Sequence, residues 1–298
     1  MLSAFFILTR IVSNPLSNVF QKKLGVHADA RVIILVTQLL LMLACLPMLF
    51  YYPPAQMGSG FWENMLLCTL LAVGGNTLIV AALRSADLSI LGPLNAYKAI
   101  VGLFLGAIIL GELPSLLGFA GVLLILGGSL FIAGRPPGVE SNRTALLELF
   151  KNRGVQLRFA ALLLSAAEAV FLKRALLTSS PGATFVYWCM LCMPLAAAVA
   201  FLGLRRRLAT ELDSVRRDPP SCLWLALTTG LMQFSTLYTF SFLQVGYSLA
   251  LFQTSALLSV LFGYHLFQEQ HLARRLLGAG VMIAGATLIV IFGGKGSL

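Results

Sequence analysis

The stretch Val19-Phe20-Gln21-Lys22-Lys23 ends the first apolar segment of the chain and returns, 151 residues later, as Val170-Phe171-Leu172-Lys173-Arg174. Further matches follow in the same order: Asn76-Thr77-Leu78 with Ser235-Thr236-Leu237, and Glu112, Gly121 and Gly128 with Glu269, Gly278 and Gly285. The chain therefore contains one hydrophobic unit twice. A duplicated hydrophobic unit is typical of membrane transporters.

The composition indicates a polytopic membrane protein. Of the 298 residues, 58% are hydrophobic and 11% are charged, and the mean hydropathy is +0.89. A chain of this length cannot bury so much apolar surface inside one water-soluble core. The composition therefore excludes an ordinary soluble globular protein.

About 20 apolar residues are needed for a helix to cross the hydrocarbon layer, and ten such segments occur. They cover residues 2–21, 32–50, 62–82, 89–110, 115–133, 158–177, 183–204, 222–243, 248–267 and 274–293. Because five helices per unit is an odd number, the second unit enters the membrane from the opposite side. The predicted fold is an all-α membrane protein with ten transmembrane helices in two inverted five-helix repeats, 1–134 and 158–298, joined by a polar linker, 135–157.

The first segment is predicted to remain as a helix rather than to act as a signal peptide. Arg10, Asn14 and Asn18 interrupt the apolar core that a signal peptide needs, and no small-residue cleavage site follows. The cysteines lie in or beside apolar segments, which favours packing over a disulfide framework or a metal site. They are Cys45, Cys68, Cys189, Cys192 and Cys222. No metal and no cofactor is expected.

Basic residues predict the orientation, since they accumulate on the cytoplasmic side of a membrane protein. Of the 19 Lys and Arg residues away from the helix centres, 16 fall on the side of the linker, when Arg158 is counted with the linker, and 3 on the other side. This distribution predicts a cytoplasmic linker and external termini. The net charge of +10 then reflects loops that face anionic lipid, so no nucleic acid partner is expected.

Several motifs occur in the same order in both units. The first unit has the polar first segment ending in Lys22-Lys23, the run Ala81-Ala82-Leu83 followed by Asp87-Leu88-Ser89, and Leu110-Gly111-Glu112 before a glycine-rich segment. The second unit keeps Gln268-Glu269 and the glycines at 278, 280 and 285, but lacks the Gly before the Glu. In this ordered set the chain resembles the EamA branch of the drug/metabolite transporter superfamily, over nearly its whole length.

The resemblance implies a ten-helix carrier with a central cavity between its halves, which moves small organic solutes by alternating access. Members of the family export amino acids, related metabolites or drugs, and more distant relatives carry nucleotide sugars or sugar phosphates. Family members commonly have both termini in the cytoplasm, which is opposite to the orientation that the charge distribution predicts.

Three ionisable residues lie near predicted helix centres: Arg10, Lys98 and Glu168. Such residues are functional candidates because a charge in hydrocarbon costs several kcal/mol unless it is paired or faces water. Arg10, Asn14, Ser17, Asn18 and Gln21 share one helical face, and the repeat places Glu168 at the position equivalent to Ser17. Two cations and one carboxylate leave a cavity at +1, which favours anionic or zwitterionic solutes.

The predicted substrate-binding residues are Arg10, Asn14, Asn18, Asn95, Lys98, Glu168, Tyr238 and Gln253. Glu168 is also the candidate for proton coupling, because burial raises the pKa of a carboxyl group. The alternative interpretation is structural: the polar side chains hydrogen-bond between helices, and Arg10 and Glu168 form a buried ion pair. Both interpretations agree with the sequence.

The sequence therefore predicts a secondary carrier that exports small amino-acid-like, anionic or zwitterionic metabolites or drugs. A flippase for a lipid or lipid-linked intermediate is the alternative. An integral membrane enzyme is less well supported, because His27, His265 and His271 are scattered and no catalytic motif occurs. The expected partners are a small solute and membrane lipids, a homodimer is compatible with the sequence, and the expected location is the plasma membrane, as in a bacterial inner membrane.

Overall fold

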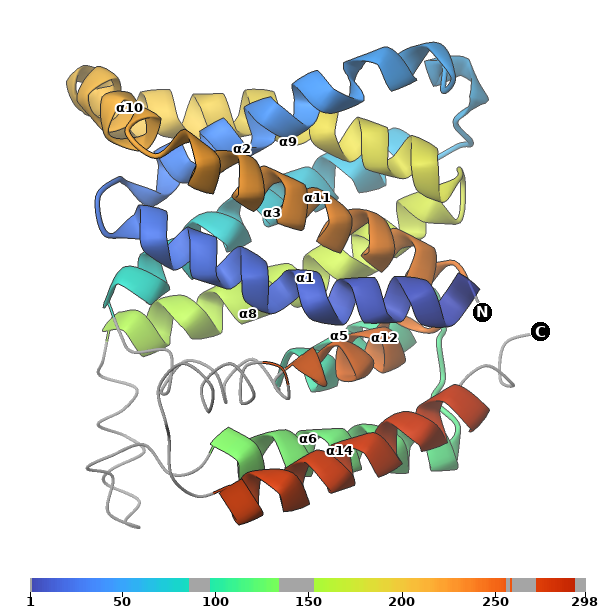
Figure 1. Cartoon of the computed structure of the whole chain (residues 1–298). Coiled ribbons are helices and arrows are strands. Elements are labelled where there is room, and N and C mark those ends of the chain that lie inside the picture. Colours follow the sequence, from blue (N-terminus) through green and yellow to red (C-terminus); the bar gives the residue numbers. More distant parts are fainter. Residues whose placement is uncertain (1, 86–96, 134–152, 256–257, 259–271, 293–298) are drawn as a thin grey trace.

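The computed structural model describes residues 2–85, 97–133, 153–255, 258 and 272–292 of the chain. Within these residues the secondary structure is entirely helical. Long helices lie side by side, and the start of α1 (Leu2–Gly25) and the end of α14 (Leu272–Phe292) lie at the same end of the bundle, on the right in Figure 1. We call this end the terminal side. The opposite end, where α8 (Arg153–Leu176) starts, is the linker side.

The described helices divide into a first and a second half. The first half contains α1, α2 (Ala30–Cys45) with the 3-10 turn η1 (Leu46–Phe50), η2 (Pro54–Gln56), α3 (Phe61–Ser85), α5 (Tyr97–Leu110) and α6 (Leu116–Ala133). The second half contains α8, α9 (Pro181–Leu204), η3 (Arg205–Arg207), α10 (Leu208–Arg216), α11 (Pro219–Phe240), α12 (Val245–Phe252) and α14. Figure 1 shows that α1 and α8, which open the two halves, run in opposite directions.

Within the described residues, helix is found in each of the ten predicted segments, although several helices begin or end a few residues away from the predicted bounds. The helix α8 starts at Arg153, so the last residues of the predicted linker 135–157 are helical. The short helix α10 lies in a predicted loop. In the part of the chain that the structure describes, four helices are long and apolar enough by themselves to cross a membrane: Ala30–Phe50, Phe61–Ala82, Arg153–Leu176 and Pro181–Leu204. With 24 and 22 residues, α1 and α11 have similar lengths but mix polar with apolar side chains.

Local sequence signals begin several helices. Ser180 caps α9 by accepting a hydrogen bond from the backbone N–H of Ala183 at 3.2 Å, and Pro181 follows at the first helical position. Asp218 caps α11 by accepting from Ser221 N–H, also at 3.2 Å. Lys23 Nζ lies 2.8 Å from the Asp218 carboxylate. The Lys23 and Ser221 hydrogen bonds lower the pKa of Asp218 to about 2, so this cap stays ionised at physiological pH.

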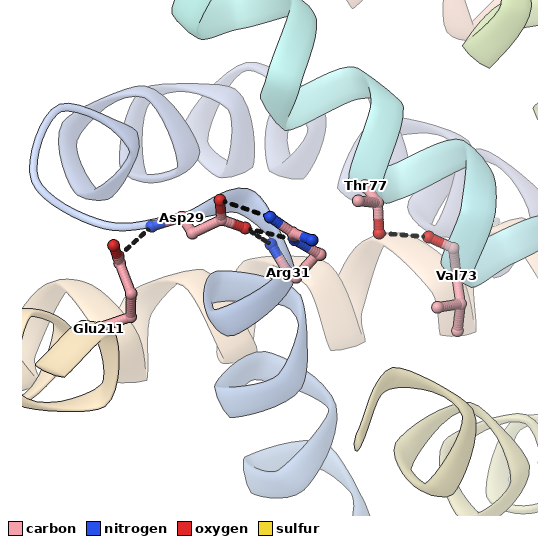
Figure 2. Close-up of polar contacts among 5 residues, drawn as sticks. All are labelled: Asp29, Arg31, Val73, Thr77 and Glu211. Carbon is pink, nitrogen blue, oxygen red and sulfur yellow. Dashed lines mark hydrogen bonds and ion pairs between the residues drawn. The ribbon is translucent and has the colours of Figure 1, made fainter. Parts of the chain in front are cut away.

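The helix α10 is held against the start of α2 by a polar cluster on the linker side, shown in Figure 2. Glu211 of α10 accepts a hydrogen bond from the backbone N–H of Asp29 at 2.7 Å. The Asp29 carboxylate in turn accepts from Arg31 Nε at 2.9 Å and Nη2 at 3.1 Å. In the same view, the Thr77 hydroxyl donates to Val73 O within α3 at 2.7 Å, so this polar side chain is satisfied inside its own helix.

The main packing contacts join the two halves of the chain. The helix α3 packs along α8, α1 along α11, α2 along α9, α5 along α12 and α6 along α14, and α5 also contacts α8. The helices of the two halves correspond in order: α1 to α8, α2 to α9, α3 to α11, α5 to α12 and α6 to α14. If each helix is replaced by its counterpart, the pair α3–α8 becomes α11–α1, and the other three pairs are unchanged. The buried core therefore lies between the halves rather than within either half.

Large apolar side chains cover the outside of the bundle. Phe5 of α1, Ile108 of α5, Phe201 of α9 and Leu223 of α11 are each at least 59% exposed. Such side chains are distributed over several helices instead of forming one patch, which fits a surface in contact with hydrocarbon.

Glycines allow α6 and α14 to pack with their backbones in contact. A Cβ atom at Gly121 would lie 2.8 Å from Gly285 O, and one at Gly128 would lie 2.6 Å from Gly278 O. Both distances are shorter than real Cβ contacts, so only glycine fits at these positions. By contrast, a Cβ at Gly127 would meet no atom within 4 Å.

We predict that Gly121→Ala and Gly128→Ala lower the stability of the purified protein by about 1–3 kcal/mol, because the added methyl group forces the two helices apart. Thermal unfolding in detergent measures this effect. Gly127→Ala is the matched control, and it should be neutral or slightly stabilising because Ala favours helix. Equal unfolding temperatures for Gly128→Ala and Gly127→Ala would contradict this description of the α6–α14 contact.

Candidate functional site

The polar face of α1 points toward α11 and α12. Arg10 Nε donates to Thr236 Oγ1 at 2.8 Å, and Asn14 Nδ2 donates to Ser255 Oγ at 3.1 Å. Further along α1, the Ser17 and Thr229 hydroxyls lie 3.3 Å apart. The spacing of these positions places them on one side of the helix, which explains why this long helix is only moderately apolar.

This face lines a cavity of about 100 Å³ between the two halves of the chain. A water molecule needs about 10–15 Å³ of such space, so the cavity holds several waters or part of a small solute. Its walls come from α1, α3 and α5 of the first half and from α8, α9, α11 and α12 of the second. Along α1 and α8 the lining extends from mid-helix toward Gln21 and Arg158, near the linker side.

Four charged side chains line the cavity: Arg10, Lys98, Arg158 and Glu168. Glu168 lies within electrostatic range of Lys98 and Arg10. The ion pairs found among the described residues do not include Glu168, so no direct salt bridge within 4 Å neutralises it. The Arg10 guanidinium lies 4.7 Å from the centre of the Phe252 ring, which is the distance of a cation–π contact. The lining thus carries three cations and one carboxylate.

Several buried polar atoms of the lining have no hydrogen-bond partner. Within the described residues, three of them are donors: Arg10 Nη1, Arg158 Nε and Trp188 Nε1. One is an acceptor, Gln21 Oε1. A buried donor without a partner costs free energy, so native proteins seldom keep one without a reason. An acceptor-rich molecule in the cavity would satisfy this set.

Most of the residues that the sequence singled out meet in this cavity. Six of the eight line it: Arg10, Asn14, Asn18, Lys98, Glu168 and Gln253. Tyr238 does not, because its ring stacks on Phe6 with centroids 4.1 Å apart. Asn95 lies outside the described residues. The binding role of all eight remains a prediction.

Arg158 is the cavity residue that sequence reasoning misplaced. It was counted among the basic residues of the linker because the predicted helix started at that position. Since α8 starts at Arg153, Arg158 lies inside the helix and on the same face as Ser165 and Glu168, seven and ten residues later. This spacing was the available signal. With Arg158 included, the formal charge of the described lining is +2 rather than +1.

No group of three or more His, Cys, Asp or Glu side chains that could hold a metal ion occurs among the described residues. The cysteines named above are buried and free. Cys45 Sγ and Cys189 Sγ lie 3.7 Å apart, where α2 packs against α9. None of the five cysteines lines the cavity.

The sequence profile of the EamA-like transporter family matches residues 1–134 and 152–291. The chain belongs to the EamA-like transporter family. It is therefore a multi-pass membrane protein with a two-repeat helical architecture, and the members of its family are transporters rather than enzymes.

Among solved structures, one described only as the crystal structure of a protein resembles this chain, with a TM-score of 0.71 and 13% sequence identity. The similarity covers 98% of this chain and 97% of the other. At this identity the likeness shows the fold alone. No curated protein sequence matches the chain significantly.

In this EamA-like transporter a polar cluster closes the bundle on the terminal side. Lys173, near the end of α8, pairs with the Glu112 carboxylate and donates to Leu243 O at 2.7 Å. Glu112 Oε2 also accepts from the backbone N–H of Val245 at 2.7 Å. Both charged side chains are 11% exposed. We call Glu112, Lys173, Leu243 and Val245 the terminal-side latch.

Two neighbouring contacts extend the latch. Ser115 N–H donates to Tyr247 Oη at 2.7 Å, and Gln244 Nε2 donates to Leu113 O at 3.2 Å. The connection between α5 and α6 is thereby bound to the connection between α11 and α12. The latch therefore joins the first half to the second at the end of the bundle opposite to Arg158.

We predict that Lys173→Met and Glu112→Gln each lower stability by on the order of 3 kcal/mol, because each leaves a buried partner unpaired. The double variant should lose less than the sum of the two. Thermal unfolding of all three measures the coupling. Arg174→Met is the control, since this neighbouring side chain is exposed. If the single variants behave like Arg174→Met, the latch does not hold the halves together.

Proposed function

We propose that the protein is a secondary carrier that moves a small anionic or zwitterionic metabolite, in the direction of export, by alternating access at the cavity between its halves. The observation that carries the proposal is the cavity itself. Charged side chains from both halves meet in it, at mid-helix positions of α1 and α8. Such side chains are expensive in a membrane unless they serve a solute or ion pathway.

An inverted repeat is supported by the arrangement of the helices. The helices α1 and α8, which begin the two halves, run in opposite directions in Figure 1, as an odd number of crossings per half requires. The five principal helix pairs are also converted into one another when the halves are exchanged. A carrier built this way has two related conformations, because either half can adopt the arrangement of the other.

Alternating access needs one side of the cavity closed while the other opens. The terminal-side latch supplies the closed side. On the linker side the cavity lining reaches Gln21 and Arg158, near the ends of their helices. We therefore propose that the described conformation is closed toward the termini. With the orientation that the basic residues predict, the cavity then faces the cytoplasm, where an exporter of the plasma membrane collects its solute.

Glu168 is the proposed proton site. It is the only acidic residue among the described residues that line the cavity, and it has no salt bridge within 4 Å there. A carboxylate that is near cations but not locked to them can gain a proton when the solute leaves. If the protein binds either a proton at Glu168 or the solute, but not both, transport is coupled to the proton gradient.

We predict that Glu168→Gln abolishes transport driven by a pH gradient and retains exchange of solute across the membrane, because the amide cannot take up a proton. Liposomes with the purified protein, a panel of labelled amino acids and organic acids, and an imposed pH gradient measure both modes. Glu63→Gln is the control, since Glu63 is an exposed carboxylate in the first turn of α3. Proton-driven transport at the wild-type rate by Glu168→Gln would make Glu168 a structural residue.

A further inference from the structure

Two arginines of the cavity each have one buried nitrogen without a hydrogen-bond partner in the described part of the chain. Arg10 Nη1 and Arg158 Nε are both buried without a hydrogen-bond partner. They come from different halves of the chain, Arg10 from α1 and Arg158 from α8. Lys98 lies within electrostatic range of both. The three cations therefore lie in one basic lining, in which Lys98 interacts with both guanidinium groups.

The carboxylate of the cavity can balance only one end of this lining. Glu168 lies within electrostatic range of Arg10 and Lys98. Arg158 and Glu168 are ten residues apart on α8, which corresponds to roughly 15 Å along the helix axis. No other acidic residue among the described residues lines the cavity. Among the described residues, no carboxylate of the lining therefore balances Arg158 at its end of the cavity.

We propose, building on the proposed carrier function, that the cavity selects solutes with two acidic groups, one bound by Arg10 and the other by Arg158. The formal charge of +2 on the described lining matches a dianion. Guanidinium groups bind carboxylate or phosphate oxygens through two parallel N–H donors, and each arginine has at least one donor free for this purpose. Arg158 is thus a specificity-determining residue.

The uncharged lining agrees with the same solute class. Trp188 Nε1 adds a further buried donor without a partner, and Gln21 Oε1 is the one buried acceptor of the described lining in the same state. A solute rich in acceptors satisfies these donors, whereas an amine would meet three cations and one carboxylate. A buried cation without a partner destabilises the empty cavity. A second acidic group on the solute would pair with Arg158 and so remove this cost.

The first test compares two probes that differ in one charge. Succinate carries two carboxylates, and its monoamide, succinamate, has the same length and one carboxylate. We expect succinate to bind the purified wild-type protein at least tenfold more tightly, since a hydrogen bond to a charged group contributes about 1.5–3 kcal/mol. Thermal stabilisation measured against ligand concentration gives both affinities. Equal affinities, or stabilisation by neither probe, would overturn the proposal.

The second test assigns the preference to Arg158. Arg158→Gln should weaken succinate binding at least tenfold and reduce the ratio of the two affinities toward one. Arg158→Lys should keep a preference for succinate, because it retains the charge. Arg153→Gln removes an exposed arginine from the start of the same helix and should bind both probes like the wild type. If the folded Arg158→Gln variant keeps the wild-type ratio of succinate to succinamate affinity, Arg158 does not bind the second acidic group.

Exchange measurements separate failure of this inference from failure of the carrier function. If liposomes with the wild-type protein exchange monocarboxylates or neutral amino acids but show no preference for dianions, the carrier stands and the dianion specificity is wrong. If they exchange no solute of the panel and succinate does not bind, both proposals are wrong.

Discussion

The hydrocarbon core of a membrane offers no water to solvate a charge, and this constraint organises the molecule. Arg10, Lys98, Arg158 and Glu168 can remain charged only if they face one another across a polar space. The helices that carry them therefore turn these faces inward and expose apolar side chains on the outside. Both the polar cavity and the apolar lipid-facing surface therefore follow from the free-energy cost of placing a charge in hydrocarbon.

The two ends of this cavity differ in how well their polar atoms are paired. On the terminal side, Glu112 and Lys173 pair with each other and with backbone groups of the connection between α11 and α12, so these polar atoms are satisfied. Toward the linker side, Arg158 Nε and Gln21 Oε1 have no partner. This difference suits the proposed carrier, because a bound solute can supply partners for the unpaired polar atoms near Arg158.

Much of this arrangement could be predicted from the sequence because it rests on periodicity. Apolar length locates the helical segments, the repeated motifs divide the chain into halves, and the spacing of Arg10 and Asn14 places both on the cavity face of α1. Arg158 could not be placed, since hydropathy alone does not show that α8 starts at Arg153. Tyr238 shows a further limit: it shares α11 with Gln233, but stacking on Phe6 keeps its ring out of the cavity.

The central claim is that one cavity is reached in turn from both sides of the membrane, and cysteine labelling at Asn18 tests it most directly. Asn18 lines the cavity, and the native cysteines are buried and serve as the unlabelled background. In vesicles of known orientation, a membrane-impermeant thiol reagent should label Asn18→Cys from the linker side. In a variant that also carries Lys173→Met, which weakens the latch, labelling from the terminal side should appear. Labelling from one side alone in both variants would contradict alternating access.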